Sequence, residues 1–319
     1  MRRLFLVVFA IGSSLLAKAQ DPITSQSMST YTELNPSFMG KDSSNVAYLN
    51  HRNQWPKIQG NYVTTRFGYH HYLSKTNGYL GLSLMRDDAG SGTLTTTNLA
   101  LNYTQNIKVR KVFIKVGAKS SYNQKVLDWS KLTFGDQIDQ QLGFTSSTSQ
   151  YRQGQQAISY LDFSVGSSIY WKGFTIGAAF FHVLEPSNGF ITFNSSVHPR
   201  VLSLQLSKTF TTDIKGHDLD ITPHVMYSKQ RDFKSNNTGL LSTYRFGILG
   251  FSYRYGDAFN TIIGFKTKYV KVIYSYDHTV SKLAPNSGGS HEISLILHPF
   301  QKKKKAHKNL VSVKSPFML

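Results

Sequence analysis

The chain contains no cysteine among its 319 residues, which excludes disulfide bonds and a lipid anchor on an N-terminal cysteine. Long apolar runs are scarce. The clearest one extends from Leu4 to Leu16, which is shorter than the ~20 residues that a helix needs to cross a bilayer. Acidic residues are also few, because 17 Asp and Glu stand against 36 Lys and Arg. These absences argue against a helical membrane protein and a disulfide-rich secreted domain.

The N-terminus has the features of an export signal. Arg2 and Arg3 precede the apolar run, and Ala17-Lys18-Ala19 supplies the small residues that a signal peptidase needs. A membrane anchor is the alternative, but the run is too short for one. The sequence therefore predicts a signal peptide at residues 1–19, cleaved before Gln20.

The rest of the chain has the composition and the periodicity of strands. It contains 18 Tyr, 21 Phe and 24 Gly, as expected of strands joined by glycine-containing turns. Apolar and polar residues alternate, for example where Leu202, Leu204 and Leu206 oppose Ser203 and Gln205. Such runs recur about every 12 to 20 residues, and there are roughly fourteen of them between positions 44 and 300.

One predicted strand shows that the polar faces of the strands cannot contact lipid. In it Val116 and Ala118 alternate with Lys115 and Lys119, and a lysine facing lipid near the midplane costs about 2–4 kcal/mol. The lysines must therefore face a wet lumen or a protein partner. A sheet in lipid must also close, because unpaired edges are not tolerated there. We predict an all-β fold: a single closed antiparallel transmembrane β-barrel of about 14 strands at residues 44–300, in the outer membrane.

A soluble β-sandwich is the alternative fold, since its strands alternate too. It does not explain the aromatic residues near the ends of the runs, which include Tyr69, Tyr72, Tyr79, Tyr253, Tyr255, Tyr274 and Tyr276. Trp55-Pro56 connects two such runs, where an indole suits a membrane–water interface.

The remaining segments lack strand signals. Residues 20–43 form a polar, irregular lead-in with breakers at Asn35-Pro36 and Gly40. Long connections are expected at 127–161 and 182–199, and in a bacterial barrel the long loops face outward. Residues 301–319 form a basic tail that strand parity places in the periplasm, either solvated or docked to an acidic partner or to lipid head groups.

The net charge favours anionic partners. Without Arg2, Arg3 and Lys18 the chain has 33 Lys and Arg against 17 Asp and Glu, a balance of about +16. An exported chain without a basic helix is not expected to bind nucleic acid. Outer-membrane lipids, lipopolysaccharide and acidic proteins are the expected partners.

No constellation of residues predicts catalysis, a cofactor or a metal. Asp87-Asp88 beside Gly90 lacks the further carboxylate of a calcium loop, and we interpret it as a turn. His70 and His71 point to opposite faces of one strand and cannot share a metal. His278 and His291 with Glu292 could belong to a hydrolase triad, but no nucleophile elbow accompanies them.

Several ordered motifs resemble one family. They are Asn35-Pro36-Ser37-Phe38-Met39-Gly40, Arg52-Asn53-Gln54-Trp55-Pro56, Asp87-Asp88-Ala89-Gly90 with Gly92, the block from Leu127 to Ile138, Asp162-Phe163-Ser164-Val165-Gly166, His182-Val183-Leu184-Glu185-Pro186, and Gly289 to Leu295. The chain resembles the PorP/SprF family of type IX secretion system membrane proteins over nearly its whole length.

The resemblance implies a non-enzymatic outer-membrane barrel. Such a barrel would act in a secretion or gliding apparatus, with type IX components or the C-terminal domain of a secreted adhesin as partner. It also marks positions for structural or partner contacts, which are Asn35, Pro36, Arg52, Asn53, Gln54, Trp55, Asp87, Asp88, Gly90, Asp128, Trp129, Lys131, Phe134, Gly135, Asp136, His182, Glu185, Pro186, His291 and Glu292. A diffusive channel and a lipid-modifying enzyme are the alternatives.

Overall fold

The computed structural model describes residues 21–26, 29–40, 45–132, 134, 137–139, 141, 143–144, 156–190, 196–281 and 284–299. The predicted signal peptide, the basic tail, Gly135 and Asp136 lie outside these residues. Of the helices in the described part of the chain, none is long and apolar enough to cross a membrane.

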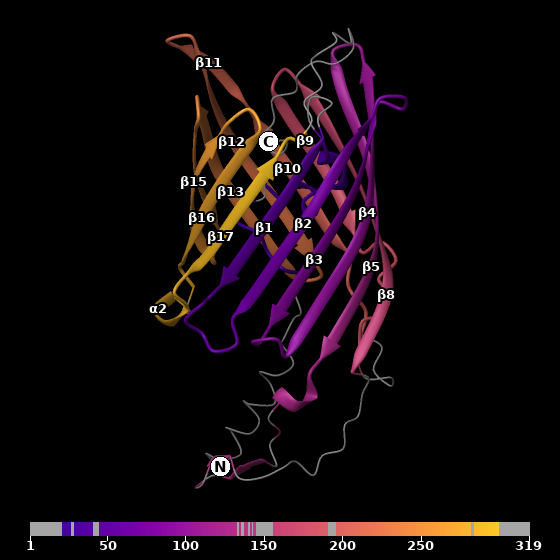
Figure 1. Cartoon of the computed structure of the whole chain (residues 1–319), viewed down its shortest axis with the longest axis vertical. Helices are drawn as coiled ribbons and strands as arrows, with labels where there is room; N and C mark the ends of the chain where they lie inside the picture. Colours follow the sequence, from indigo (N-terminus) through magenta and orange to yellow (C-terminus); the bar gives the residue numbers. More distant parts are fainter. Residues whose placement is uncertain are drawn as a thin grey trace.

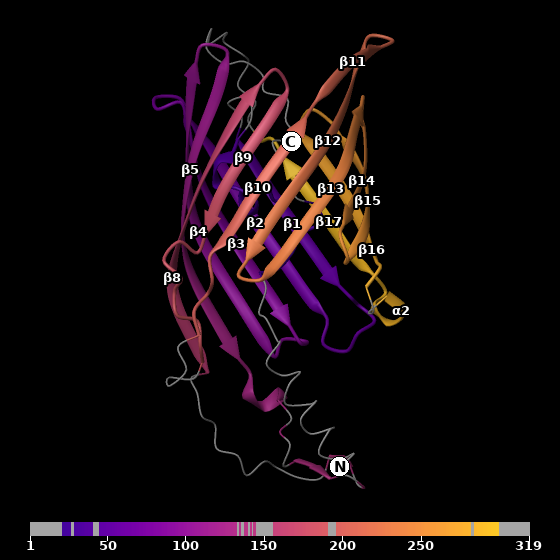
Figure 2. The same cartoon turned by 180° about the vertical axis from the view of Figure 1, so that it is seen from behind.

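The structure is a closed antiparallel β-barrel (Figures 1 and 2). In chain order its strands are β1 (Val46–Gln54), β2 (Tyr62–Leu73), β3 (Gly78–Ala89), β4 (Leu94–Val109), β5 (Val112–Leu127), β8 (Ala157–Trp171), β9 (Phe174–Phe181), β10 (Val201–Lys208), β11 (Phe210–Ile214), β12 (His217–Gln230), β13 (Phe233–Tyr244), β14 (Gly247–Arg254), β15 (Ala258–Lys266), β16 (Val270–Thr279) and β17 (Ser290–Leu297). Pairing of β1 with β17 and of β10 with β12 closes the ring. Because β11 continues β10 along β12, the wall has 14 strands, and the predicted fold is confirmed.

The alternation of apolar and polar side chains along the strands explains why this chain forms a closed barrel. In β14 the outward Leu249 and Phe251 are about half exposed, whereas the inward Ser252 and Arg254 are buried. A strand puts successive side chains on opposite faces, so the apolar set can contact lipid while the polar set lines the lumen. Lys115 and Lys119 are buried and face inward, which is one of the two positions that the sequence left open.

The two ends of the barrel differ in their connections. At one end, which we call the short-turn end, β1 begins and β17 ends, and the connections are residues 74–77, 110–111, 172–173, 215–216, 245–246 and 267–269. The opposite, long-loop end has 55–61, 90–93, 128–156, 182–200, 231–232, 255–257 and 280–289, the last of which contains α2 (Ala284–Ser287; Figure 1).

Two predicted boundaries change. The long connection spans 128–156, because strand β8 already begins at Ala157 rather than after Leu161. The interpretation of Asp87-Asp88 as a turn was wrong, because both residues belong to β3 and the turn begins at Gly90. Arg86 and Thr95 contact Asp88 while Thr64 contacts Asp87, which keeps the pair extended.

The described part of the lead-in lies inside the barrel. Residues 21–26 and 29–40, which we call the lumen segment, contain two short 3-10 helices, η1 (Tyr31–Glu33) and η2 (Pro36–Phe38). Asn35 caps η2 with its side chain, and Pro36 starts it, which is a favoured position for proline. The segment contacts strands all around the wall, including β1, β2, β4, β5, β8, β10, β16 and β17. Its irregular backbone was predicted, but its position was not.

Apolar side chains gather near the short-turn end of the lumen. They form a cluster of buried residues from the wall, consisting of Val46, Tyr48, Leu241, Ile248, Ile262, Ile273 and Ile296. Tyr79 also faces the lumen and is buried, so it does not belong with the outward tyrosines that the sequence suggested. The interior is therefore packed as well as polar.

Candidate functional site in the barrel lumen

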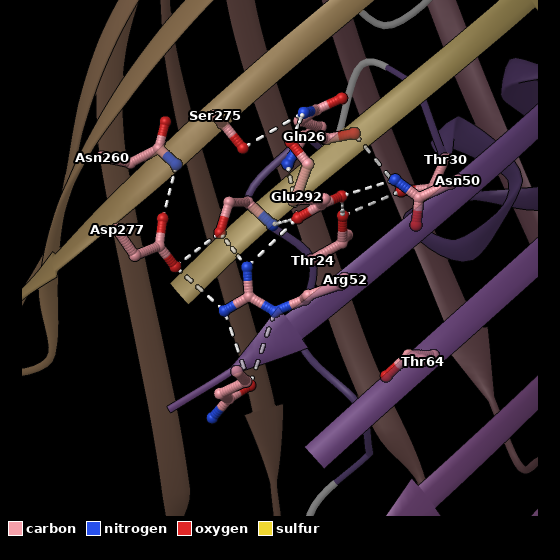
Figure 3. Close-up of polar contacts among 12 residues, drawn as sticks. Thr24, Gln26, Thr30, Asn50, Arg52, Thr64, Asn260, Ser275, Asp277 and Glu292 are labelled. Atoms are coloured by element: carbon pink, nitrogen blue, oxygen red, sulfur yellow. Dashed lines mark hydrogen bonds and ion pairs between the residues drawn. The ribbon is translucent and has the colours of Figure 1, made fainter. Parts of the chain in front are cut away.

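An arginine on β1 joins two carboxylates from neighbouring strands (Figure 3). The guanidinium of Arg52 lies 2.9 Å from Asp277 on β16 and 3.1 Å from Glu292 on β17. All three side chains are at most 2% exposed. The planar guanidinium can contact two carboxylates at once, which a lysine cannot do as well. This group therefore fixes the register of the strands where the barrel closes.

The lumen segment completes the same network. Ser25 accepts a hydrogen bond from Arg52 and donates one to Asp277. The backbone N–H of Ser25 donates to Glu292 at 2.8 Å. The side-chain amide of Gln26 donates to the backbone oxygen of Glu292 at 2.7 Å and to Ser275 at 3.2 Å. The segment is thus held by charged and amide groups of the wall.

A second arginine balances the charge. Arg254 on β14 lies 2.7 Å from Asp257 and 3.5 Å from Asp277. Asn260 on β15 also donates to Asp277. Buried charges are costly unless they are paired and hydrogen-bonded. Here each carboxylate of the network has a cationic partner.

On the opposite wall the segment meets glycines. Gly117 on β5, Gly166 on β8 and Gly177 on β9 lie on adjacent strands, and we call them the glycine trough. A Cβ atom at Gly117 would overlap the backbone of Pro36, and one at Gly166 would overlap the carboxamide of Asn35. Glycine leaves the room that η2 needs for this close approach.

Polar contacts hold η2 in the trough. The side-chain amide of Asn35 faces the backbone oxygens of Ser167 and Ala178 at 3.1 and 3.2 Å. The backbone oxygen of Pro36 accepts from Thr104 at 2.8 Å. The first family motif is therefore a docking element inside the barrel.

The two inward lysines of β5 also bind the segment. Lys119 contacts the carboxylate of Glu33 at 2.9 Å, and Lys115 donates to the backbone oxygen of Gly40 at 2.6 Å. The sequence predicts that these lysines face either a wet lumen or a protein partner. In the structure they face the lumen and contact the lumen segment of the same chain.

At the long-loop end two histidines meet one carboxylate. The Nε2 atoms of His182 and His198 lie 2.9 and 2.8 Å from the two oxygens of Asp21, the first residue of the lumen segment. Nδ1 of His182 lies 2.7 Å from Asp162 on β8. Burial lowers the pKa of His182, but the hydrogen bonds to Asp162 and Asp21 outweigh it and raise this pKa to about 9.

The other motif residues of the first turn support the barrel rim. Trp55 adopts a positive φ of 58° and donates its backbone N–H to the backbone oxygen of Gly289. Its indole ring packs edge-on against Tyr62. Gln54 accepts weakly from Arg52 at 3.4 Å. Asn53 accepts from Asn61 at 2.8 Å. These contacts order the connection 55–61, as the sequence predicts for a turn.

The Asp128 block begins the longest loop. Asp128 caps a third 3-10 helix, η3 (Trp129–Lys131), by accepting from Ser130. Lys131 donates to the backbone oxygen of Ser91, which lies in the turn that begins at Gly90. The backbone N–H of Phe134 donates to the side chain of Gln137. This block therefore contacts a neighbouring turn at the long-loop end of the barrel.

Residues of the two remaining motifs lie in different environments. Glu185 forms an exposed ion pair with Arg200, and Pro186 accepts from the backbone N–H of His198. His291 is exposed and contacts Tyr274, whereas its neighbour Glu292 is buried in the lumen. The triad considered for His291 and Glu292 does not assemble there, because the two side chains lie on opposite faces of β17.

Sequence reasoning missed several residues that make contacts in the lumen. Ser25, Arg254 and Asp277 were not singled out as a site, nor were Asp21 and His198. A usable signal was present: Arg254 and Asp277 are charges at polar positions of alternating strands, where a barrel requires them to face inward. The contacts of Ser25 could be predicted only with the knowledge that the lead-in enters the lumen.

Comparisons with known proteins found one family model and several solved structures that are similar to this chain. The model of one family, described as type IX secretion system membrane protein PorP/SprF, matches residues 16–297. No curated protein sequence gives a match. Among solved structures, the outer membrane protein Omp33 of Acinetobacter baumannii is similar at 8% identity and a TM-score of 0.45, covering 80% of this chain and 99% of that one. The β domain of the Bordetella autotransporter BrkA has 12% identity and a TM-score of 0.39, covering 81% and 100%, and the KdgM porin has 9% and 0.37, covering 80% and 99%.

Proposed function

Because the chain belongs to the PorP/SprF family of type IX secretion system membrane proteins and forms an outer-membrane β-barrel, we propose that it is a non-enzymatic component of the type IX secretion or gliding apparatus. In this role it supports the secretion or surface anchoring of a large adhesin-type cargo. Its partners are type IX components or the C-terminal domain of the adhesin, held at the loops or at the periplasmic face.

The observation that carries this proposal is the filled lumen. The lumen segment is held by Arg52 and Glu292 on one wall and by the glycine trough on the other. An anchor needs a rigid frame, and a filled barrel provides one because packed interiors resist deformation. A conduit for solutes needs an open lumen instead.

We place the partner site at the long-loop end. Long loops of bacterial barrels face outward and short turns face the periplasm. Figure 1 shows η3, the short coiled ribbon that follows β5, beyond the strands at this end. There Ile138 on β6 (Ile138–Asp139) and Phe144 on β7 (Gly143–Phe144) are 57% and 68% exposed. Exposed apolar groups outside the lipid band suit contact with another protein.

The first experiment is a deletion of the gene with complementation. We expect loss of surface display of one or more large adhesins while uptake of small solutes stays normal. Complementation with the Ile138→Ser/Phe144→Ser variant should fail although the barrel assembles. The matched control is Phe246→Ser, which removes an exposed aromatic side chain at the short-turn end. Unchanged adhesin display in the deletion strain would refute the proposed function, and failure of the control alone would move the partner site to the periplasmic face.

A diffusive channel is the second candidate, favoured by the inward lysines. Its test is conductance in planar bilayers. We expect the purified protein to show no steady channel, because Lys115 and Lys119 are engaged by the lumen segment. Steady anion-selective conductance would support the channel instead.

A further inference from the structure

The cluster at the long-loop end has the arrangement of metal ligands. Nε2 of His182, Nε2 of His198 and the carboxylate of Asp21 converge, with all three ligand atoms within 4.8 Å of one another. The two imidazole rings are nearly parallel, with centroids 3.7 Å apart. Both rings thus direct the same nitrogen at one carboxylate, although they come from the two ends of the connection 182–200.

The groups behind the rings strengthen this interpretation. Nδ1 of His182 lies 2.7 Å from Asp162, and Nδ1 of His198 lies 3.4 Å from the hydroxyl of Tyr160. Metal-ligating histidines almost always donate their second N–H to a carboxylate or another oxygen, which fixes the ring and its tautomer. Both histidines here have such an acceptor on β8. Asp162 is 3% exposed, so it is well placed to hold its ring rigidly.

The donor set selects the class of ion. Imidazole nitrogen suits Zn²⁺ and other first-row transition ions, whereas Ca²⁺ and Mg²⁺ prefer oxygen ligands. The N···O distances of 2.8 and 2.9 Å are those of hydrogen bonds. Around a tetrahedral Zn²⁺ the ligand atoms lie roughly 3.3 Å apart. An ion would therefore take the place of the proton between each Nε2 atom and Asp21, after small movements of the three side chains.

We propose that Asp21, His182 and His198 bind one divalent transition-metal ion of the Zn²⁺ class, with a remaining coordination position open to water. Such an ion would fasten the start of the lumen segment to the connection 182–200. The segment would then be fixed at the long-loop end by the metal and deeper in the barrel by Arg52 and the glycine trough. This site does not depend on the proposed role in secretion.

The test is metal titration of the full-length protein. The protein is purified in detergent without a polyhistidine tag, stripped with a chelator and titrated with ZnCl₂ by calorimetry. We expect binding of one equivalent of Zn²⁺ and no comparable binding of CaCl₂. CoCl₂ should give the visible absorption bands of a nitrogen-ligated Co²⁺ site. A wild-type protein that binds neither Zn²⁺ nor Co²⁺ would overturn the proposal.

Variants identify the ligands. His198→Ala and Asp21→Asn should abolish the binding, and Asp162→Asn should weaken it about 10–100-fold because it loosens a ring without removing a ligand. The matched control is His217→Ala, which removes an exposed histidine at the short-turn end. Asp21→Asn preserves side-chain size and so remains informative if His198→Ala does not assemble, which a heat-dependent gel mobility shift reveals. Wild-type affinity in an assembled Asp21→Asn or His198→Ala variant would show that two hydrogen bonds, and no metal, join the three residues.

Discussion

The two walls of the lumen hold one segment by different physical means. On β1, β16 and β17, Arg52, Asp277 and Glu292 form ion pairs with one another and hold Ser25 through charged hydrogen bonds. On β5, β8 and β9 the wall gives space to η2 through three glycines, and the two lysines of β5 contact the segment at Glu33 and Gly40, on either side of η2. We call the side formed by Arg52, Asp277 and Glu292 the ionic wall. The ionic wall depends on the presence of side chains, whereas the glycine trough depends on their absence.

This difference sets the response of each wall to substitution. Removing one member of a buried ion network leaves another charge unpaired in a place that water does not reach. Adding a methyl group to the trough creates a clash that the segment can relieve by moving. The ionic wall should therefore be the more sensitive of the two, and the following substitutions test that order.

Arg52→Met should have the largest effect. It leaves Asp277 and Glu292 buried with Arg254 as their remaining cation, and breaking a buried pair typically costs about 3–5 kcal/mol. We expect a corresponding loss in the free energy of unfolding, measured by urea titration in lipid vesicles. The matched control is Arg86→Ala, because Arg86 pairs with Asp88 but is 63% exposed, and such pairs contribute about 0–1 kcal/mol. Equal effects of the two variants would contradict the ionic wall.

Gly166→Ala should have an intermediate effect. The new Cβ overlaps the carboxamide of Asn35, and overpacking costs about 1–3 kcal/mol. Adding Asn35→Ala removes the overlapping group, so the glycine substitution should cost less in that background, and the double-mutant cycle measures the coupling. Gly247→Ala is the control, because its nearest neighbour is at an ordinary contact distance. Strict additivity of Gly166→Ala and Asn35→Ala would argue against contact between them.

Lys119→Met should have the smallest effect of the three. Lys119 pairs with Glu33, whose side chain is 23% exposed. Water can therefore partly replace the lost ammonium group, and we expect a cost of about 1–2 kcal/mol in the same unfolding assay. The Lys119→Met/Glu33→Gln variant should recover part of that loss, since no carboxylate then remains unpaired. A loss as large as that of Arg52→Met would erase the distinction between the walls.

The wall of the barrel was accessible to sequence reasoning. Its signal is local, because lipid on one side and a polar lumen on the other force the period of two seen in β5 and β14. The number of strands followed from counting such runs. The cost of placing Lys115 and Lys119 in lipid also limited their position to a wet lumen or a protein partner.

The contents of the lumen were not accessible in the same way. The lumen segment has no periodicity, and its partners can be far away in the sequence: Asp277 and Glu292 are 252 and 267 residues from Ser25. A polar stretch with Asn35-Pro36 is equally consistent with a solvated linker. The glycines at 117 and 166 also have a local explanation as flexible strand positions. Only the register that pairs Gly117 with Gly166 reveals the trough.

The most direct test of the filled lumen is a disulfide between the segment and the wall. Ser37 of η2 and Ser168 of β8 are buried with their hydroxyl oxygens 2.8 Å apart, and the natural chain has no cysteine to compete. In the Ser37→Cys/Ser168→Cys variant, we predict oxidation-dependent cross-linking of the assembled barrel, seen as a mobility shift of the denatured chain and as a linked peptide by mass spectrometry, with neither single variant shifting. Two free thiols that both react with a water-soluble maleimide under oxidising conditions would show that the segment lies outside the lumen.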